Sequence, residues 1–277
     1  GHRRDFYERN SSFAFDPTEL DAVILSHAHI DHSGNLPNLV KQGYRGPIYA
    51  TPPTVDLAAI MLADSAHIYE EDAAFLNKKK RKHGEAMVEP LYTRYDAEKV
   101  ESLFEPINYD QPFQPVEGVT ARFVEAGHIL GSSAIILEVE ESEERKRLWF
   151  SGDIGRYKLP LLRDPVLPQD ANILLMECTY GNRQHDDPEQ AYRKFRDIVK
   201  RTIQRGGNVV VPAFAVGRTQ EILHVLADLS RAGRVPPLTV IVDSPLARAA
   251  TEVTARHAAS LERETREDSL PGLANRR

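Results

Sequence analysis

Hydrophobic and polar positions along this chain follow two different periods. Short apolar runs predict buried strands, and longer segments with helical spacing of apolar residues separate them. We expect strands at 21–25, 47–50, 119–125, 133–140, 147–151, 171–179, 208–214 and 238–243. We expect helices at about 36–43, 55–77, 96–104, 188–205, 218–232 and from about 246. Alternation of this kind is typical of the α/β class, in which helices cover a largely parallel sheet.

Residues with special backbone or capping properties predict where these elements begin and end. Gly43 is a usual residue just past a helix, and Pro52 and Pro53 suit a helical first turn. Asp96 is the predicted N-cap of the helix 96–104. The charged segment 141–146 lies between two strands and predicts a hairpin.

The polar stretch SHAHIDH, residues 26–32, directly follows the first apolar run. It places four metal-capable side chains, His27, His29, Asp31 and His32, within six consecutive positions. Imidazole and carboxylate groups are ligands for zinc and similar divalent ions. The alternative is a polar loop with surface histidines. It is disfavoured because three of the ten histidines of the chain fall in this stretch. The dense spacing suits two metal ions better than one.

Two further ligand candidates stand at predicted strand ends. His128 follows the strand 119–125, and Asp153 follows the strand 147–151, each with a glycine directly before it. Alone, either residue would more often be an ordinary polar side chain. Together with the stretch 26–32, they predict a common cleft at one edge of the sheet.

Five segments of the chain resemble a known family. They are LSHAHIDHSGNLPNLV (25–40), EAGHILGSS (125–133), FSGDIGR (150–156), LLMECTYGN (174–182) and VPAFAVGRTQEIL (211–223). HxHxDH after an apolar strand resembles the signature of the metallo-β-lactamase superfamily. The five segments are similar to its β-CASP branch of RNA-processing metallo-hydrolases, which includes the cleavage and polyadenylation endonuclease and its bacterial relatives.

The resemblance implies a fold and a domain division. Residues 1–181 would form a partial αββα hydrolase domain whose opening strands are missing. Residues 182–277 would form the first part of an inserted β-CASP α/β cap domain, which is incomplete. On this comparison we expect the chain to be truncated at both ends.

The resemblance also implies a ligand set for two zinc ions. The implied ligands are His27, His29 and His128 for one zinc, Asp31 and His32 for the second, and Asp153 as the bridge. The second zinc is then one protein ligand short. The family supplies a further histidine from a later part of its chain, and the residues around His257 do not match that position.

The expected chemistry is zinc-dependent hydrolysis of RNA by a metal-bound hydroxide, in an endonuclease, a 5′-exonuclease or both. By resemblance the catalytic residues are Asp31, Asp153 and Glu177. Glu177 matches an acidic residue thought to hydrogen-bond a histidine in the missing part. As an isolated carboxylate it could equally be structural. His185, in a polar turn, is a weak candidate for substrate contact.

The segment around residues 212–221 suggests a substrate contact. Gly217 permits a tight turn before a new helix, whose N-terminus can hold an anion, and Arg218 could grip a phosphate. Phe214 could stack on a base or pack in the core.

Ser244 could face the cleft or serve as a plain helix cap. The basic run 78–82 is either a solvated charged segment or a phosphate-contacting lid.

Composition limits which binding partners and which cellular location we expect. The 277 residues carry a net charge of −6, which disfavours non-specific coating by nucleic acid but not a local basic channel. The single cysteine, Cys178, excludes an internal disulfide framework and favours the cytoplasm. No membrane segment or secretory signal is expected. Single-stranded RNA is the expected partner, DNA is not excluded, and homo-oligomerisation stays open.

Two alternatives to the nuclease remain. One is a hydrolase of small thioesters or lactams on the same fold, which the segment 182–277 disfavours. The other is an inactive truncated member that only binds RNA or a partner protein.

Overall fold

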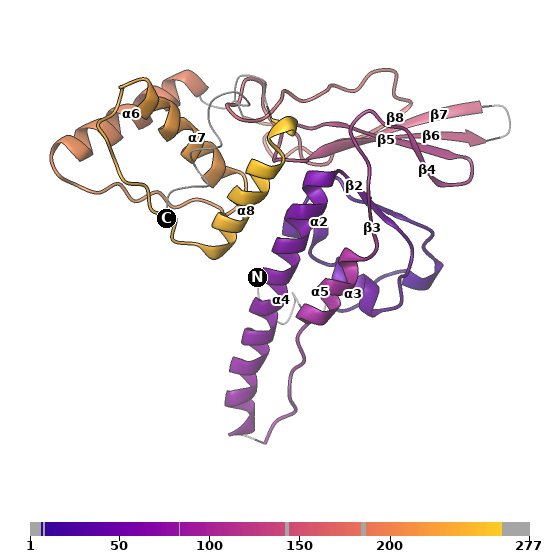
Figure 1. Ribbon diagram of the computed structural model, residues 1–277. Helices are drawn as coiled ribbons and strands as arrows, with labels where there is room; N and C mark the ends of the chain where they lie inside the picture. Colours follow the sequence, from indigo (N-terminus) through magenta and orange to yellow (C-terminus); the bar gives the residue numbers. More distant parts are fainter. Residues whose placement is uncertain (1–6, 8, 83, 142–143, 184–186, 262–277) are drawn as a thin grey trace.

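The computed structural model describes residues 7, 9–82, 84–141, 144–183 and 187–261. In this part of the chain, two sheets and several helices alternate, which confirms the α/β class (Figure 1). The first sheet is parallel and has the order β1 (Val23–Ile24), β2 (Ile48–Ala50) and β3 (Phe104–Pro106). The second sheet has the order β4 (Phe113–Val116), β5 (Val119–Glu125), β6 (Ser133–Glu141), β7 (Glu144–Phe150) and β8 (Ile173–Leu175).

Strands β4 to β7 are antiparallel to one another, and β8 pairs with β7 in parallel. The predicted hairpin is present as the β6–β7 pair, whose register joins Glu141 to Glu144. The described helices are η1 (Pro17–Glu19), α2 (Ile30–Ser33), α3 (Leu36–Lys41), α4 (Pro52–Arg81), α5 (Arg94–Glu101), α6 (Pro188–Gln204), α7 (Arg218–Arg231), α8 (Pro245–Arg256) and η2 (Ala258–Ser260). None of them combines the length and apolarity that a bilayer-spanning helix needs.

One apolar core joins the first sheet to the helices around it. Ile48 of β2 and Leu57 of α4 are almost fully buried in it. Ala250 and Val253 of α8 belong to the same core, so α8 packs along the upper part of α4 (Figure 1). Burial of such side chains is the main source of folding free energy. Helix α8, in the last third of the chain, therefore shares a core with the first third.

The two sheets are connected through aromatic rings and backbone hydrogen bonds. The rings of Tyr49 in β2 and Phe113 in β4 lie 4.8 Å apart, and Phe113 lies 5.3 Å from Phe123 in β5. The backbone N–H of Ser133, the first residue of β6, donates to the carbonyl of Ser26 over 2.8 Å. This bond ties the stretch 26–32 to the second sheet.

The prediction that Asp96 is an N-cap is wrong. The helix α5 begins two residues earlier, with Thr93 as its N-cap, and Asp96 is the third helical residue of a capping box. Asp96 Oδ2 accepts from the backbone N–H of Thr93 over 2.9 Å. The predicted end of this helix is also wrong, because residues Phe104–Pro106 form β3 and pair with β2.

The predicted strands 208–214 and 238–243 do not occur, because neither segment pairs with another strand among the described residues. Apolar sequence supplies strand propensity, but a strand also needs a partner for its backbone groups. Val210, Phe214 and Ile241 are each more than four-fifths exposed. The predicted strand 171–179 shortens to β8 for the same reason.

The basic run 78–82 lies at the end of α4, which spans 30 residues, or about 45 Å at 1.5 Å per residue. The opposite end of α4 adjoins the loop before β6, because Thr51 Oγ1 donates to the carbonyl of Gly131 over 2.6 Å. Figure 1 shows the far end of α4 projecting away from both sheets. This position favours the solvated segment over a lid near the stretch 26–32.

Candidate metal centre

The stretch 26–32 crosses from the end of β1 into α2 and is fixed by side-chain hydrogen bonds at both ends. Ser133 Oγ donates to the carbonyl of Ser26 over 3.0 Å. Ser33 Oγ donates to the carbonyl of Ala28 over 2.8 Å. His27 is fully buried between these two anchors, and its Nδ1 lies 3.1 Å from Ser26 Oγ. The Nε2 atom of His27 is thereby left to face the centre.

The loop that carries His128 turns around a single serine. Ser132 Oγ accepts from the backbone N–H of His128 over 3.0 Å and from that of Ile129 over 3.2 Å. The carbonyl of Ser132 accepts from Tyr109 OH over 2.8 Å. Glu125 Oε1 accepts from the backbone N–H of Gly127 over 2.9 Å, which braces the residue before His128. Sequence reasoning assigned no role to Ser132, Tyr109 or Glu125.

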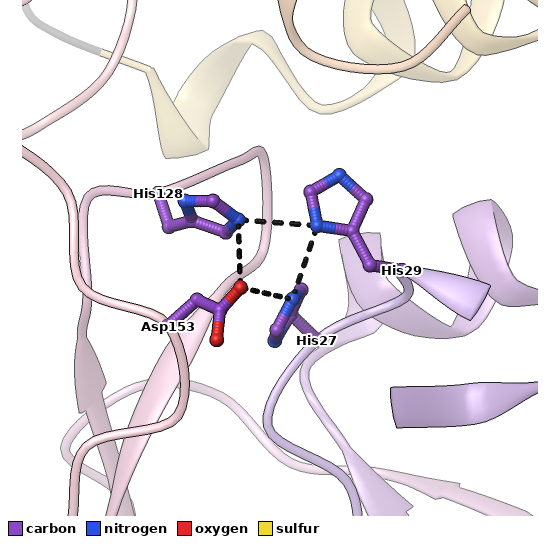
Figure 2. Close-up of side chains that lie close together, drawn as sticks. All are labelled: His27, His29, His128 and Asp153. Carbon is purple, nitrogen blue, oxygen red and sulfur yellow. Dashed lines mark hydrogen bonds and ion pairs between the residues drawn. The ribbon is translucent and has the colours of Figure 1, made fainter. Parts of the chain in front are cut away.

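Four side chains from three separate segments converge in Figure 2. His29 Nδ1 lies 3.2 Å from His27 Nε2 and 3.1 Å from His128 Nε2. Asp153 Oδ2 lies 3.7 Å from His27 Nε2 and 3.4 Å from His128 Nε2. A zinc ion with bonds of about 2.0–2.1 Å at tetrahedral angles separates its ligand atoms by about 3.3–3.4 Å. The spacing of these four atoms therefore matches a tetrahedral divalent ion.

A second group shares Asp153 with the first. Asp153 Oδ1 lies 3.3 Å from His32 Nε2, and Asp31 Oδ2 lies 3.7 Å from the same nitrogen. Asp31 is the exposed member, with 78% of its side chain accessible. This group offers three ligand atoms from the described residues. The structure thus brings together all six side chains that the sequence offered as ligands.

The protonation state of the histidines suits metal binding. Burial, followed by the neighbouring imidazoles of His32, His29 and His128, lowers the pKa of His27 to about 2. Burial also lowers the pKa of His29, and it lowers that of His128 against the opposing charges of Asp153 and Glu177. Neutral imidazoles keep a lone pair for a metal. The donor set and its spacing therefore fit divalent metal binding.

A cavity of about 460 Å³ opens beside this centre. Its lining includes His29, His128 and Asp153 and also residues of the last third of the chain. Among the latter are Phe214, which is 84% exposed, and Arg218. The exposure of Phe214 rules out the alternative that it packs in the core of the described chain.

Glu177 lines the same cavity at the edge of the second sheet. Its Oε2 accepts from the backbone N–H of Thr179 over 2.9 Å, and its Oε1 accepts from that of Ile154 over 3.3 Å. Partial burial acts to raise the pKa of Glu177, but these hydrogen bonds lower it overall. The group is a carboxylate that fixes the segment after Asp153, and its catalytic role stays a prediction.

The other predicted substrate contacts differ in their positions. Arg218 lines the cavity, but its Nη1 donates to Glu221 Oε2 over 2.6 Å. Ser244 is the N-cap of α8, where its Oγ accepts from the backbone N–H of Ala247 over 3.1 Å, and it does not line the cavity. Substrate contact by either residue stays a prediction. His185 lies outside the described residues.

His257, for which the sequence suggested no role, belongs to neither candidate ligand group. Its Nε2 lies 2.8 Å from Asp56 Oδ2, so it joins the end of α8 to the start of α4.

Comparisons with known proteins agree with this geometry. A family model described as "Metallo-beta-lactamase superfamily domain" matches residues 7–145. The chain is 37% identical over 238 residues to Ribonuclease TTHA0252 of Thermus thermophilus, which covers 86% of this chain and 49% of that protein. It is 35% identical over 248 residues to Transcription termination factor FttA of Methanosarcina mazei, covering 88% of this chain and 36% of that one.

A third relative is the RNase J-like protein of Methanocaldococcus jannaschii, 32% identical over 241 residues, which are 84% of this chain and 50% of that protein. The chain thus spans half or less of the length of each of these three relatives. Their names are consistent with the β-CASP branch that processes RNA.

Proposed function

Because the chain belongs to the metallo-β-lactamase superfamily, we propose that it carries the metal-binding core of a hydrolase that cleaves RNA phosphodiester bonds. The observation that carries this proposal is the position of Asp153. Its Oδ2 faces His27 and His128, and its Oδ1 faces His32. One carboxylate shared by two ligand groups is the arrangement expected of a two-metal hydrolase.

We propose zinc as the metal in both groups, because the ligands are mostly imidazole nitrogens. When bound, two such ions lower the pKa of a water molecule and offset negative charge on a phosphate. The neutral side chains of His27, His29 and His128 would hold the first ion. Asp31 and His32 would hold the second with fewer protein ligands.

The substrate is proposed to be RNA, single-stranded where it enters the cavity. Support comes from the names of the relatives and from the cavity, to which both proposed domains contribute. Residues 1–181 are proposed as the hydrolase domain and residues 182–277 as the first part of the cap. We propose a cytoplasmic location, because RNA is the proposed substrate and the single cysteine favours a reducing compartment.

Cleavage assays on the purified protein test the proposal. Internally labelled and 5′-labelled RNA of one sequence distinguish internal cuts from end-wise digestion, and the matching DNA tests the choice of nucleic acid. Asp153→Ala should reduce RNA cleavage at least a thousandfold, while Asp197→Ala, an exposed aspartate on α6, should leave it unchanged.

Three results would contradict the proposal. One is RNA cleavage that Asp153→Ala leaves intact. Another is turnover of a thioester or lactam in place of RNA, which would indicate the small-molecule hydrolase. The third is RNA binding without any cleavage in the presence of added zinc, which would indicate a binding protein.

A further inference from the structure

The cavity beside the metal ligands contains two arginines from the described residues, Arg156 and Arg218. They differ in their partners. Arg218 forms an ion pair of 2.6 Å with Glu221, whose second oxygen accepts from Tyr192 OH over 2.9 Å. The charge of Arg218 is therefore largely compensated within the protein.

Among the residues that the structure describes, none compensates the charge of Arg156 in this way. Within the described ranges, its guanidinium makes no hydrogen bond and no ion pair, although the residue is only partly exposed. A partly buried cation without an anionic partner costs free energy, and a bound anion would recover it. Such a group in a cavity is a candidate contact for a negatively charged ligand.

The backbone fixes Arg156 relative to the metal ligands. It lies three residues after Asp153, and the intervening Gly155 donates its N–H to the carbonyl of Ala126 over 2.8 Å. A Cβ on Gly155 would lie 1.7 Å from the carbonyl oxygen of Gly127, so only glycine allows the two loops to approach this closely. Arg156 is thus carried by the same rigid loop as Asp153.

The charge of Arg156 also acts on a residue of the last third of the chain. Burial and the Glu221 carboxylate raise the pKa of Tyr192 on α6, and the positive charge of Arg156 opposes that rise. The guanidinium therefore lies within electrostatic reach of the network formed by Tyr192, Glu221 and Arg218. Arg156 thus lies close to Asp153 along the chain and also within electrostatic reach of the last third of the chain.

We infer that Arg156 forms a phosphate-binding subsite, which holds a backbone phosphate of the substrate next to the one held at the metal centre. The guanidinium can donate two parallel N–H bonds to a phosphate, which a lysine cannot reproduce. The inference rests on the proposed function, because a second phosphate subsite is useful only if the substrate carries several phosphates, as RNA does.

Salt dependence of RNA binding tests the subsite, since each phosphate contact contributes about −0.7 to the slope of log K against log salt for a single strand. The probe is a fluorescently labelled 12-nucleotide RNA with non-hydrolysable linkages, titrated with the purified protein between 50 and 300 mM KCl. The variants are Arg156→Ala and Arg156→Lys. The matched control is Arg248→Ala, which removes an exposed arginine of α8 outside the cavity.

Arg156→Ala should weaken binding about tenfold or more at 100 mM salt and reduce the slope by about 0.7. Arg156→Lys should keep the slope but lose part of the affinity, and Arg248→Ala should match the wild type. Thermal unfolding of each variant shows whether weaker RNA binding results from a lost contact or from an unfolded protein. If Arg156→Ala does not fold, Arg156→Lys provides the test.

An unchanged affinity and slope for Arg156→Ala would overturn the subsite while leaving the proposed function intact. So would a loss of affinity with an unchanged slope, because that would indicate a structural role. Cleavage of the unmodified RNA is assayed in parallel. A wild type that binds RNA with the expected slope but never cleaves it would overturn the proposed function and not the subsite.

Discussion

The backbone N–H of Gly155 donates a 2.8 Å hydrogen bond to the carbonyl of Ala126. This contact joins the loop that carries Asp153 to the loop that carries His128. The two loops that carry these candidate metal ligands are therefore joined by a direct backbone contact.

Gly155→Ala should disrupt the metal centre. The added Cβ would lie 1.7 Å from the carbonyl oxygen of Gly127, so the two loops must separate. We expect at least a tenfold loss of zinc affinity and a decrease of about 1–3 kcal/mol in the free energy of unfolding. Zinc titration against a chelator and urea unfolding measure the two effects.

The control for this variant is Gly206→Ala, at a glycine with nothing within 4 Å of the added Cβ. Its backbone φ of 76° leaves only local strain of about 1–2 kcal/mol. Equal effects of the two substitutions on zinc affinity would contradict the role assigned to Gly155.

The buried imidazole of His27 should make the metal-free protein sensitive to acid. Its pKa is about 2 in the folded state and 6.5 in the unfolded reference, so below pH 6.5 the unfolded state binds more protons. The stability that the neutral side chain supports is present above pH 6.5. It is lost progressively as the pH falls from 6.5 towards 2, by at most about 1.4 kcal/mol per pH unit.

Comparison with His27→Gln in the presence of EDTA isolates this effect. The free energy of unfolding of the wild type should fall relative to that of the variant as the pH is lowered from 7 to 5. A constant difference between the two proteins across this range would contradict the burial of a neutral His27.

Glu125 should show the opposite dependence on pH. Burial raises its pKa from 4.5 to about 7, against hydrogen bonds from the backbone and Tyr109 and the charge of Arg163. Between pH 4.5 and 7 the folded state binds the extra proton, so stability is lost as the pH rises. Glu125→Gln keeps an acceptor for Gly127 and removes the charge.

The variant Glu125→Gln should therefore be more stable than the wild type above pH 7, by on the order of 3 kcal/mol. The difference should vanish near pH 4.5. Urea unfolding at a series of pH values measures it, and a wild type that is the more stable protein at pH 8 would refute the raised pKa.

The contact between His257 and Asp56 should stabilise the packing of α8 on α4. The two side chains lie 2.8 Å apart and are partly exposed, so His257→Ala should cost about 0.5–1 kcal/mol. His67→Ala is the matched control, because His67 pairs with Glu71 within α4 at 3.4 Å on an exposed surface. A double-mutant cycle with Asp56→Asn measures the coupling, and a coupling energy of zero would remove the proposed role.

Much of the fold and all of the ligand candidates could be predicted from sequence. The apolar runs place β5 at 119–125 and β6 from 133, because both strands bury consecutive side chains and pair with a sequence neighbour. Dense spacing of metal-capable residues identified the stretch 26–32. The glycines directly before His128 and Asp153, both at predicted strand ends, singled out these two residues as further candidates.

Other features depended on contacts between distant parts of the chain. The segments 208–214 and 238–243 have strand composition but pair with no other strand in the part of the chain that the structure describes. Composition cannot show whether a pairing strand is present. Ser132 and Glu125 brace His128 through backbone N–H groups, which leave no trace in residue spacing. Arg156 lies within the segment FSGDIGR, but only the structure shows that, among the described residues, no carboxylate pairs with it as Glu221 pairs with Arg218.

The most direct test of the account is the zinc content of the purified protein and of two variants after dialysis. Asp153 belongs to both ligand groups, whereas Asp31 belongs only to the second. The account predicts at least one tightly held zinc in the wild type, its retention in Asp31→Ala, and its loss in Asp153→Ala. A wild type that retains no zinc, or an Asp153→Ala variant that retains as much as the wild type, would contradict the shared metal centre.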